Sequence, residues 1–118
     1  MNKSEIGKFG EDFAARYLSG KGYMIKDRNF RGKHGEIDII AYDMDGCLVF
    51  VEVKTRKNDD YGYPSEFVDR KQQKRLRYMA QLYSGDDMYM RFDIIEVYYG
   101  NSPDGMYVKA VNHIENAF

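Results

Sequence analysis

The sequence predicts an α/β fold in which helices flank one central mixed β-sheet, with the elements in the order αβββαββ. The chain has 118 residues, which suits a single domain over residues 1–118 that buries roughly two-thirds of the surface of the unfolded chain. Apolar residues recur at helical spacing in two segments, and they alternate or form short runs in five others. Clusters of Gly, Asn, Asp and Pro separate these segments, as turns require.

The first helix is expected at residues 4–19. Ser4 is a suitable N-cap, and Gly20 and Gly22 suit the end of the helix. The apolar side chains at helical spacing are Ile6, Phe9, Phe13, Tyr17 and Leu18.

Two glycines and two acids in this helix bear on its packing. Gly7 and Gly10 lower helix propensity, so we expect a close backbone approach there. On a helical projection Glu11 lies at the flank of the apolar face, whereas Asp12 points to the far side. Of these two acids, only Glu11 is placed to face another element.

Three strands are expected next, at residues 23–30, 36–42 and 48–54. In the second of them Ile37, Ile39 and Ala41 occupy one face, and Glu36, Asp38, Ile40 and Tyr42 occupy the other. In the third, Val49, Val51 and Val53 oppose Leu48, Phe50, Glu52 and Lys54. The second and third strands therefore each have one face that carries charges.

The turn between these two strands sets their register. A three-residue loop at 44–46, with Gly46 at the left-handed position, places Asp43 opposite Cys47. Counting back along both strands then brings Asp38 opposite Glu52. A two-residue turn would shift the register by one residue and break this pairing.

The second helix is expected at residues 69–83, ended by Ser84 and Gly85. Its apolar stripe consists of Leu76, Met79, Ala80 and Tyr83, and Gln72 and Gln73 extend it toward the N-terminus. Two last strands follow, at residues 89–99 and 106–111, joined by a turn over residues 101–105.

The predicted register brings two carboxylates and an ammonium group together. The Cβ atoms of Asp38 and Glu52 would lie roughly 5 Å apart, with Lys54 on the same face. Like charges at this distance repel, and burial penalises both. A divalent cation resolves the conflict, because Mg²⁺ is held by one or two carboxylates together with waters and a substrate phosphate. The pattern therefore predicts a metal-dependent phosphodiester hydrolase, in which Lys54 activates water or stabilises charge on the phosphate.

The same three side chains also suit an exposed network of salt bridges with no catalytic role. The neighbouring residues favour catalysis, because Ile40, Leu48 and Phe50 add apolar bulk to the charged face. The hairpin is therefore expected to be buried on both sides, where charges are costly. Glu11 would reach the same metal if the first helix packs over the hairpin.

These residues resemble a known nuclease signature. The segments 35–38 (GEID) and 50–56 (FVEVKTR) resemble the PD-(D/E)xK superfamily, and the whole chain resembles the YraN family of small bacterial proteins, close to archaeal Holliday-junction resolvases. Further matching stretches are residues 7–11, 22–23, 28–31, 71–74 and 113–118. Ile37 stands where the superfamily usually has proline, a departure that leaves the metal ligands unaffected.

The resemblance implies a restriction-endonuclease-like core and a set of site residues. Glu11, Asp38 and Glu52 would hold Mg²⁺ or Mn²⁺, Lys54 would be the catalytic lysine, and Gln73 would be an accessory catalytic residue. The activity implied is that of a metal-dependent endonuclease, and the resolvases point to branched or other non-B DNA. One such site nicks one strand, so double-strand or junction cleavage predicts a homodimer.

Basic residues occur on both sides of the predicted site and would bind the phosphates of a nucleic acid. The candidates are Arg28, Arg31, Lys33, Arg56, Lys71 and Lys74. Charge runs of this kind are also typical of solvated surfaces. The polar segment 58–64 is expected to be a loop, which in a nuclease would contact the substrate or be mobile and in any other protein would be merely a connection. Asp93 is interpreted as structural.

Three classes of function are compatible with these residues: a nuclease, a nucleic-acid-binding module that does not cut, and an interaction domain with a structural acidic centre. The complete set of Glu11, Asp38, Glu52 and Lys54 favours the nuclease. DNA is the expected partner, and the residues themselves leave RNA open as well.

Composition excludes several other classes. The net charge of −1 argues against a protein that simply coats a polyanion. The longest apolar run, residues 47–51, is too short to span a membrane, and residues 1–9 lack the apolar stretch of a secretory signal. A single cysteine, Cys47, forms no internal disulfide and no zinc site of its own. A cytoplasmic location is expected.

Overall fold

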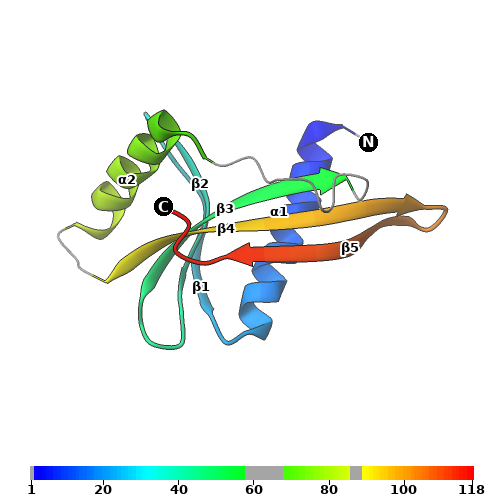
Figure 1. Ribbon diagram of the computed structural model, residues 1–118, viewed down its shortest axis with the longest axis horizontal. Helices are drawn as coiled ribbons and strands as arrows, with labels where there is room; N and C mark the ends of the chain where they lie inside the picture. Colours follow the sequence, from blue (N-terminus) through cyan, green and yellow to red (C-terminus); the bar gives the residue numbers. More distant parts are fainter. Residues whose placement is uncertain (1, 58–67, 86–88) are drawn as a thin grey trace.

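The computed structural model describes residues 2–57, 68–85 and 89–118, so the predicted loop at 58–64 lies outside the described residues. The elements follow the expected order αβββαββ (Figure 1). They are α1 (Lys3–Gly20), β1 (Met24–Gly32), β2 (Gly35–Tyr42), β3 (Leu48–Lys57), α2 (Arg70–Ser84), β4 (Met90–Ser102) and β5 (Gly105–Ile114).

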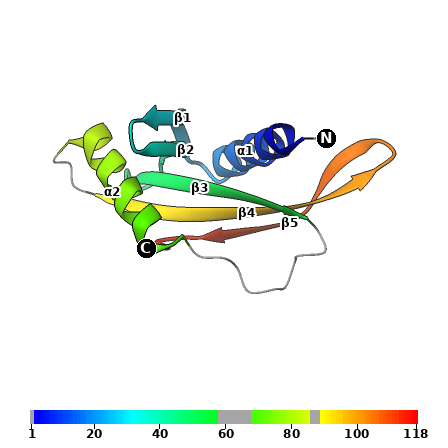
Figure 2. The same ribbon diagram turned by 90° about the horizontal axis from the view of Figure 1, so that it is seen from above.

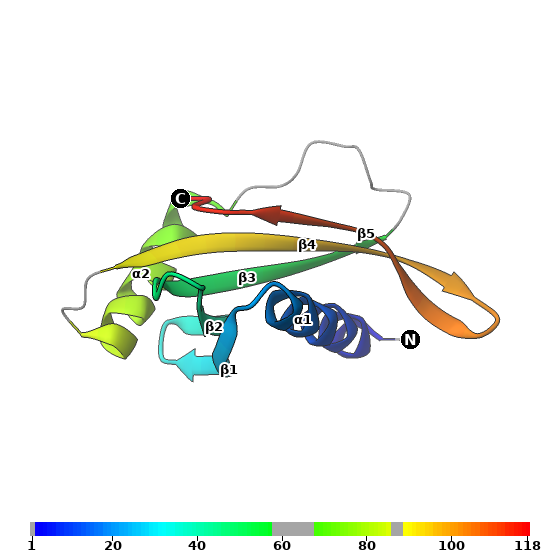
Figure 3. The ribbon, with the colours of Figure 1, turned by 90° about the horizontal axis from the view of Figure 1, so that it is seen from below.

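The five strands form one mixed sheet in the order β1-β2-β3-β4-β5. The β3–β4 pair is parallel and the other three pairs are antiparallel. A parallel pair needs a crossover connection, and α2 lies within it. The strands β3, β4 and β5 run side by side along the molecule, and β1 and β2 lie on the α1 side of β3 (Figure 3).

The two helices pack on two separate apolar clusters, because successive strand side chains point to opposite faces. On one face, α1 packs with Ala14 and Leu18 against Val49, Val51 and other residues. On the other face, α2 packs with Leu76, Met79 and Ala80 against a cluster that includes Leu48 and Phe50. Figure 2 shows the helices at different ends of the sheet, with the hairpin end of β4 and β5 extending past α1.

The register of the β2–β3 hairpin is as predicted. Tyr42 pairs with Leu48, the N–H of Asp43 donates to the carbonyl oxygen of Cys47 at 3.0 Å, and Gly46 has φ +85°. One facing prediction is wrong: Ile37 packs in the α2 cluster with Ile40, whereas Ile39 packs in the α1 cluster. The alternation of β2 side chains between the two faces of the sheet is therefore broken at Asp38, and a regular strand pattern does not predict this.

The ends of α1 also differ from expectation. Asn2, not Ser4, is the N-cap, because its side chain accepts the N–H of Glu5 at 2.9 Å. The helix continues through Gly20, and the chain turns at Gly22, where φ is +93°.

The two helical glycines have different surroundings. A Cβ at Gly10 would lie 1.9 Å from Thr55 Oγ1, which confirms the close approach to β3, whereas a Cβ at Gly7 would meet nothing within 4 Å. The prediction for Gly7 is therefore wrong.

Candidate active site

Asp38 lies where β2 separates from β3. The paired residues run from Tyr42–Leu48 to Ile39–Val51, so the next position places Asp38 beside Glu52. Asp38 Oδ2 accepts the backbone N–H of Val53 at 2.8 Å. The Asp38 carboxylate thus accepts the Val53 N–H, which a carbonyl oxygen of a paired strand would otherwise accept. This hydrogen bond fixes the Asp38 side chain against β3.

Asp38 and Glu52 both hold protons more tightly than ordinary carboxyls. Burial raises the pKa of Asp38 to about 6, opposed by the Val53 hydrogen bond and reinforced by the charges of Glu11 and Glu36. Burial and the nearby charge of Asp38 raise the pKa of Glu52 to about 8, although Lys54 opposes the shift. The pair therefore retains a proton at pH values where ordinary carboxyls are ionised.

Glu11 faces this pair from α1. Its Oε1 accepts hydrogen bonds from Arg28 Nε (3.2 Å), Arg28 Nη2 (3.0 Å) and Asn29 Nδ2 (2.9 Å). Arg28 Nη2 also pairs with Asp12 Oδ1 at 2.6 Å and holds the pKa of Asp12 below its usual value. The prediction that Asp12 points to the far side is therefore wrong: β1 reaches both acids with one guanidinium.

An open groove of about 1080 Å³ runs past these residues. Glu11, Asp38 and Lys54 line it, and Glu52 does not. Its basic lining residues are Lys3, Lys8, Arg28, Arg31, Lys54, Arg56 and Lys57. The groove thus combines a small acidic centre with a cationic rim, a charge pattern that suits a metal ion and a polyanion together.

Arg56 is held in the groove by a buried acid that the sequence did not single out. Arg56 Nε donates to Glu96 Oε2 at 2.9 Å, and Asn112 Nδ2 donates to Glu96 Oε1 at 2.8 Å. The Glu96 side chain is fully buried, and Glu96 lies opposite Lys54 in the parallel register. This contact orients one groove cation close to Lys54.

The remaining predicted residues lie apart from the groove lining. Gln73 is half-buried, and its Nε2 donates to the carbonyl oxygen of Val68 at 2.8 Å, just before α2. Lys33 is exposed in the turn between β1 and β2, and Lys71 and Lys74 are exposed on α2. Of the six predicted phosphate-binding residues, Arg28, Arg31 and Arg56 are those that line the groove.

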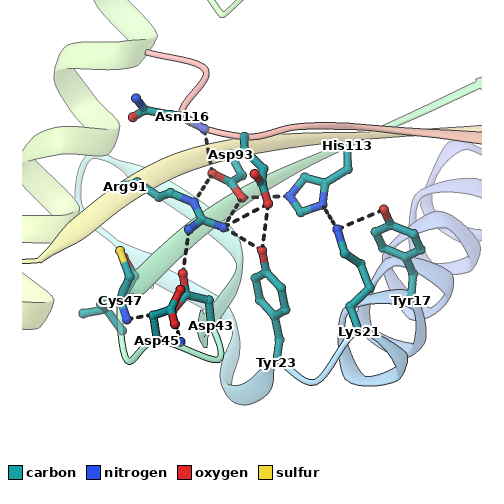
Figure 4. A network of polar contacts seen from close by, with 12 residues as sticks. Tyr17, Lys21, Tyr23, Asp43, Asp45, Cys47, Arg91, Asp93, His113 and Asn116 are labelled. Carbon is teal, nitrogen blue, oxygen red and sulfur yellow. Dashed lines mark hydrogen bonds and ion pairs between the residues drawn. The ribbon is translucent and has the colours of Figure 1, made fainter.

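A second polar network, centred on Arg91, lies near the C-terminal end of α1 (Figure 4). Arg91 pairs with Asp43 (2.6 Å), Asp93 (3.0 Å) and Glu115 (3.5 Å), and it donates to the Tyr23 hydroxyl at 2.6 Å. Burial alone would raise the pKa of Asp93, but hydrogen bonds from His113 and Arg91 hold it below its usual value. These contacts fit the interpretation of Asp93 as structural.

This network also contains a set of possible metal ligands. Within residues 2–57, 68–85 and 89–118, the donor atoms of Asp93, His113 and Glu115 all lie within 4.8 Å of one another, which those of Glu11, Asp38 and Glu52 do not. Lys21 Nζ contacts His113 Nδ1, and an ammonium only donates, so His113 Nε2 carries the proton that bonds Asp93. The guanidinium of Arg91 already pairs with the carboxylates of Asp93 and Glu115, so these possible ligands have a protein cation as partner. Asp38 and Glu52 share no guanidinium.

Sequence reasoning missed this network and Glu96 for different reasons. Arg91 and Asp93 carry a local signal, because they are two residues apart on one strand face. The contacts from Tyr23 and Asp43 span 68 and 48 residues, and no periodicity reports them. Glu96 stands among apolar residues of β4, and this apolar context is the only feature of the sequence that indicates a buried acid there.

A family model described as "Uncharacterised protein family UPF0102" matches residues 10–97. A UPF0102 protein of Caldanaerobacter subterraneus subsp. tengcongensis is 47% identical, over 100% of this chain and 98% of that protein. A UPF0102 protein of Alkaliphilus oremlandii is 46% identical, with full coverage of both chains.

Among solved structures, a repair endonuclease from Pyrococcus abyssi is similar, with a TM-score of 0.44 and 22% identity. The match covers 78% of this chain and 36% of that one, so the chain spans about a third of its length. In the described part of the chain, no helix combines the length and apolar character that crossing a membrane requires.

Proposed function

The chain belongs to the UPF0102, or YraN, family, as its motifs predicted, and we propose that it is a Mg²⁺- or Mn²⁺-dependent endonuclease acting on DNA. The observation that carries the proposal is the pair of half-buried carboxyls, Asp38 and Glu52, side by side next to Lys54. The charge of Asp38 raises the free energy of the charged form of Glu52, and no Lys or Arg of the described residues forms an ion pair with either carboxyl.

The donor set suits a hard divalent cation. Asp38, Glu52 and Glu11 offer only carboxylate oxygens, the ligands that Mg²⁺ and Mn²⁺ prefer. When bound, the metal would supply Lewis-acid activation of the phosphodiester and of the attacking water. Metal binding would also release the proton that Glu52 holds.

The protein's own residues have separate tasks in this proposal. Lys54 stabilises the negative charge that grows on the phosphate during hydrolysis. Arg56, held by Glu96, and Arg31 bind the flanking phosphates along the groove. One such site cuts one strand, so we propose that two copies act together on branched or double-stranded DNA.

Cleavage of a nucleic-acid panel tests the proposal. Duplex, single-stranded and four-way-junction DNA, together with RNA, would be incubated with Mg²⁺ or Mn²⁺. We expect metal-dependent cutting of DNA, loss of cutting in Glu52→Gln, and a rate reduced by roughly 100-fold or more in Lys54→Ala. The matched control is Lys109→Ala, which removes an exposed lysine from β5 and leaves the rate unchanged.

Two results would contradict the proposal. Binding of DNA without cutting under any metal condition would favour the non-cleaving nucleic-acid-binding module. Cutting that persists in both Glu52→Gln and Lys54→Ala would show that the acid pair is not the catalytic centre.

A further inference from the structure

Asn29 has an unusual backbone conformation next to the acid pair. Its φ is +54°, and in the described chain only one other non-glycine residue, Asn116 (φ +52°), has a positive φ. Arg28 pairs with Ile39 and Phe30 pairs with Ile37, so Asn29 occupies the position opposite Asp38. Left-handed backbone at a residue with a Cβ costs free energy, and such positions persist where the surrounding structure holds them.

The side chain of Asn29 reaches out of β1 toward α1. Its Nδ2 donates to Glu11 Oε1 at 2.9 Å and so links β1 to α1. Arg28 donates two hydrogen bonds to the same oxygen atom. Three donors therefore converge on Oε1.

The other oxygen of Glu11 is left available. Within residues 2–57, 68–85 and 89–118, every side-chain hydrogen bond to Glu11 is accepted by Oε1 and none by Oε2. The Glu11 side chain is 12% exposed and lines the groove that Asp38 and Lys54 also line. The charge of Glu11 raises the pKa of Asp38, so the two carboxylates interact electrostatically.

We propose that Asn29 is a positioning residue that fixes Glu11 through Oε1, so that Oε2 remains free to bind the divalent metal together with Asp38. This inference rests on the proposed metal centre and assigns to it an outer residue that does not contact the metal. Hydrogen bonds from such residues orient ligands and keep their lone pairs directed at the ion. The left-handed backbone of Asn29 is what lets a strand residue reach α1 from this position.

Asn29 offers a cleaner test than Arg28. The amide is neutral, so its removal leaves the charge of the site unchanged, whereas loss of the Arg28 guanidinium would itself attract a cation. Glycine adopts positive φ without steric cost, so Asn29→Gly removes the amide and keeps the backbone. Asn116→Gly is the matched control, because it makes the same change at the same backbone conformation beside Asp93.

The experiment titrates Mn²⁺ into wild type, Asn29→Gly and Asn116→Gly at pH 8 by calorimetry, and records thermal melting of each protein without metal. We expect Asn29→Gly to bind Mn²⁺ about 10-fold more weakly, with a melting temperature equal to or above that of wild type. Asn116→Gly should bind Mn²⁺ as wild type does.

Each other outcome overturns the inference in a recognisable way. Equal Mn²⁺ affinity in wild type and Asn29→Gly would show that Asn29 does not position Glu11, while the metal centre itself would stand. Weaker binding accompanied by a melting temperature several degrees lower would assign Asn29 a structural role instead. Absence of Mn²⁺ binding in the wild type would remove the proposed metal centre, and this inference with it.

Discussion

The raised pKa values of Asp38 and Glu52 make the stability of the folded protein depend on pH. In the unfolded chain both carboxyls ionise near their ordinary values, whereas in the folded state Glu52 holds its proton up to about pH 8. A raised pKa in the folded state means that stability is fully present below the unfolded value and falls as pH rises through the folded one. Without metal, the free energy of unfolding should therefore decrease between about pH 4.5 and pH 8.

Replacing Glu52 by Gln removes both the buried charge and its repulsion with Asp38. Because only the charged form is penalised, we expect Glu52→Gln to raise the free energy of unfolding by roughly 1–3 kcal/mol at pH 8.5 and to have little effect at pH 4. Chemical denaturation at the two pH values measures this difference.

Glu36→Gln serves as the control, because Glu36 is more exposed and should shift stability by no more than about 0.5 kcal/mol. A Glu52→Gln protein that is less stable than wild type at pH 8.5 would show that Glu52 is stabilised in its charged form.

At the scale of elements, the approach of α1 to β3 decides where Glu11 lies. Gly10 packs against Thr55, and the lack of a Cβ brings the helix backbone close to the strand that carries Glu52 and Lys54. Glu11 is the next residue along the helix. The glycine therefore sets the distance between the acid on α1 and those on the hairpin.

Alanine at the two helical glycines should have opposite effects. Gly10→Ala introduces a clash with Thr55 and should lower the free energy of unfolding by roughly 1–3 kcal/mol. Gly7→Ala meets nothing within 4 Å and should raise it by roughly 0.5–1 kcal/mol through helix propensity. Thermal and denaturant unfolding measure both, and equal effects would show that the helix does not approach the strand as described.

Local sequence patterns predicted the order of the elements and the register of the hairpin better than the facing of single side chains or the position of the helix cap. Alternation and the loop length at Gly46 were sufficient for the β2–β3 register, because register follows from turn geometry. The facing of Ile37 could not be predicted, since the alternation of side chains between the two faces is broken at Asp38, opposite Asn29. The Asn2 cap was missed because Ser4 offers the same chemistry two residues later, and only the backbone shows which residue is used.

At the scale of the whole molecule, the Arg91 network connects segments far apart in sequence. Tyr23 precedes β1, Asp43 follows β2, Asp93 lies in β4 and Glu115 follows β5, and all four contact one guanidinium. No sequence pattern links these positions, so the network became visible only with the fold. Its residues do not line the groove.

Removing the central cation would leave the buried carboxylate of Asp93 without its guanidinium partner. Arg91→Met should lower the free energy of unfolding by roughly 3–5 kcal/mol and leave metal affinity unchanged. Arg77→Met is the comparison, since Arg77 is exposed and stacks over Phe92 and Phe118, and its loss should cost about 1 kcal/mol or less. Similar losses in the two variants would mean that the Arg91 network is not a stabilising centre.

The most direct test of the central claim, that Asp38 and Glu52 form a metal centre, is calorimetric titration of Mg²⁺ and Mn²⁺ at pH 7.5 in two buffers of different ionisation enthalpy. The comparison counts the protons released on binding. We expect one site, with release approaching one proton because Glu52 is protonated at this pH, and loss of both binding and release in Glu52→Gln. Binding that is retained in Glu52→Gln and abolished in His113→Gln would place the metal in the Arg91 network and contradict the account.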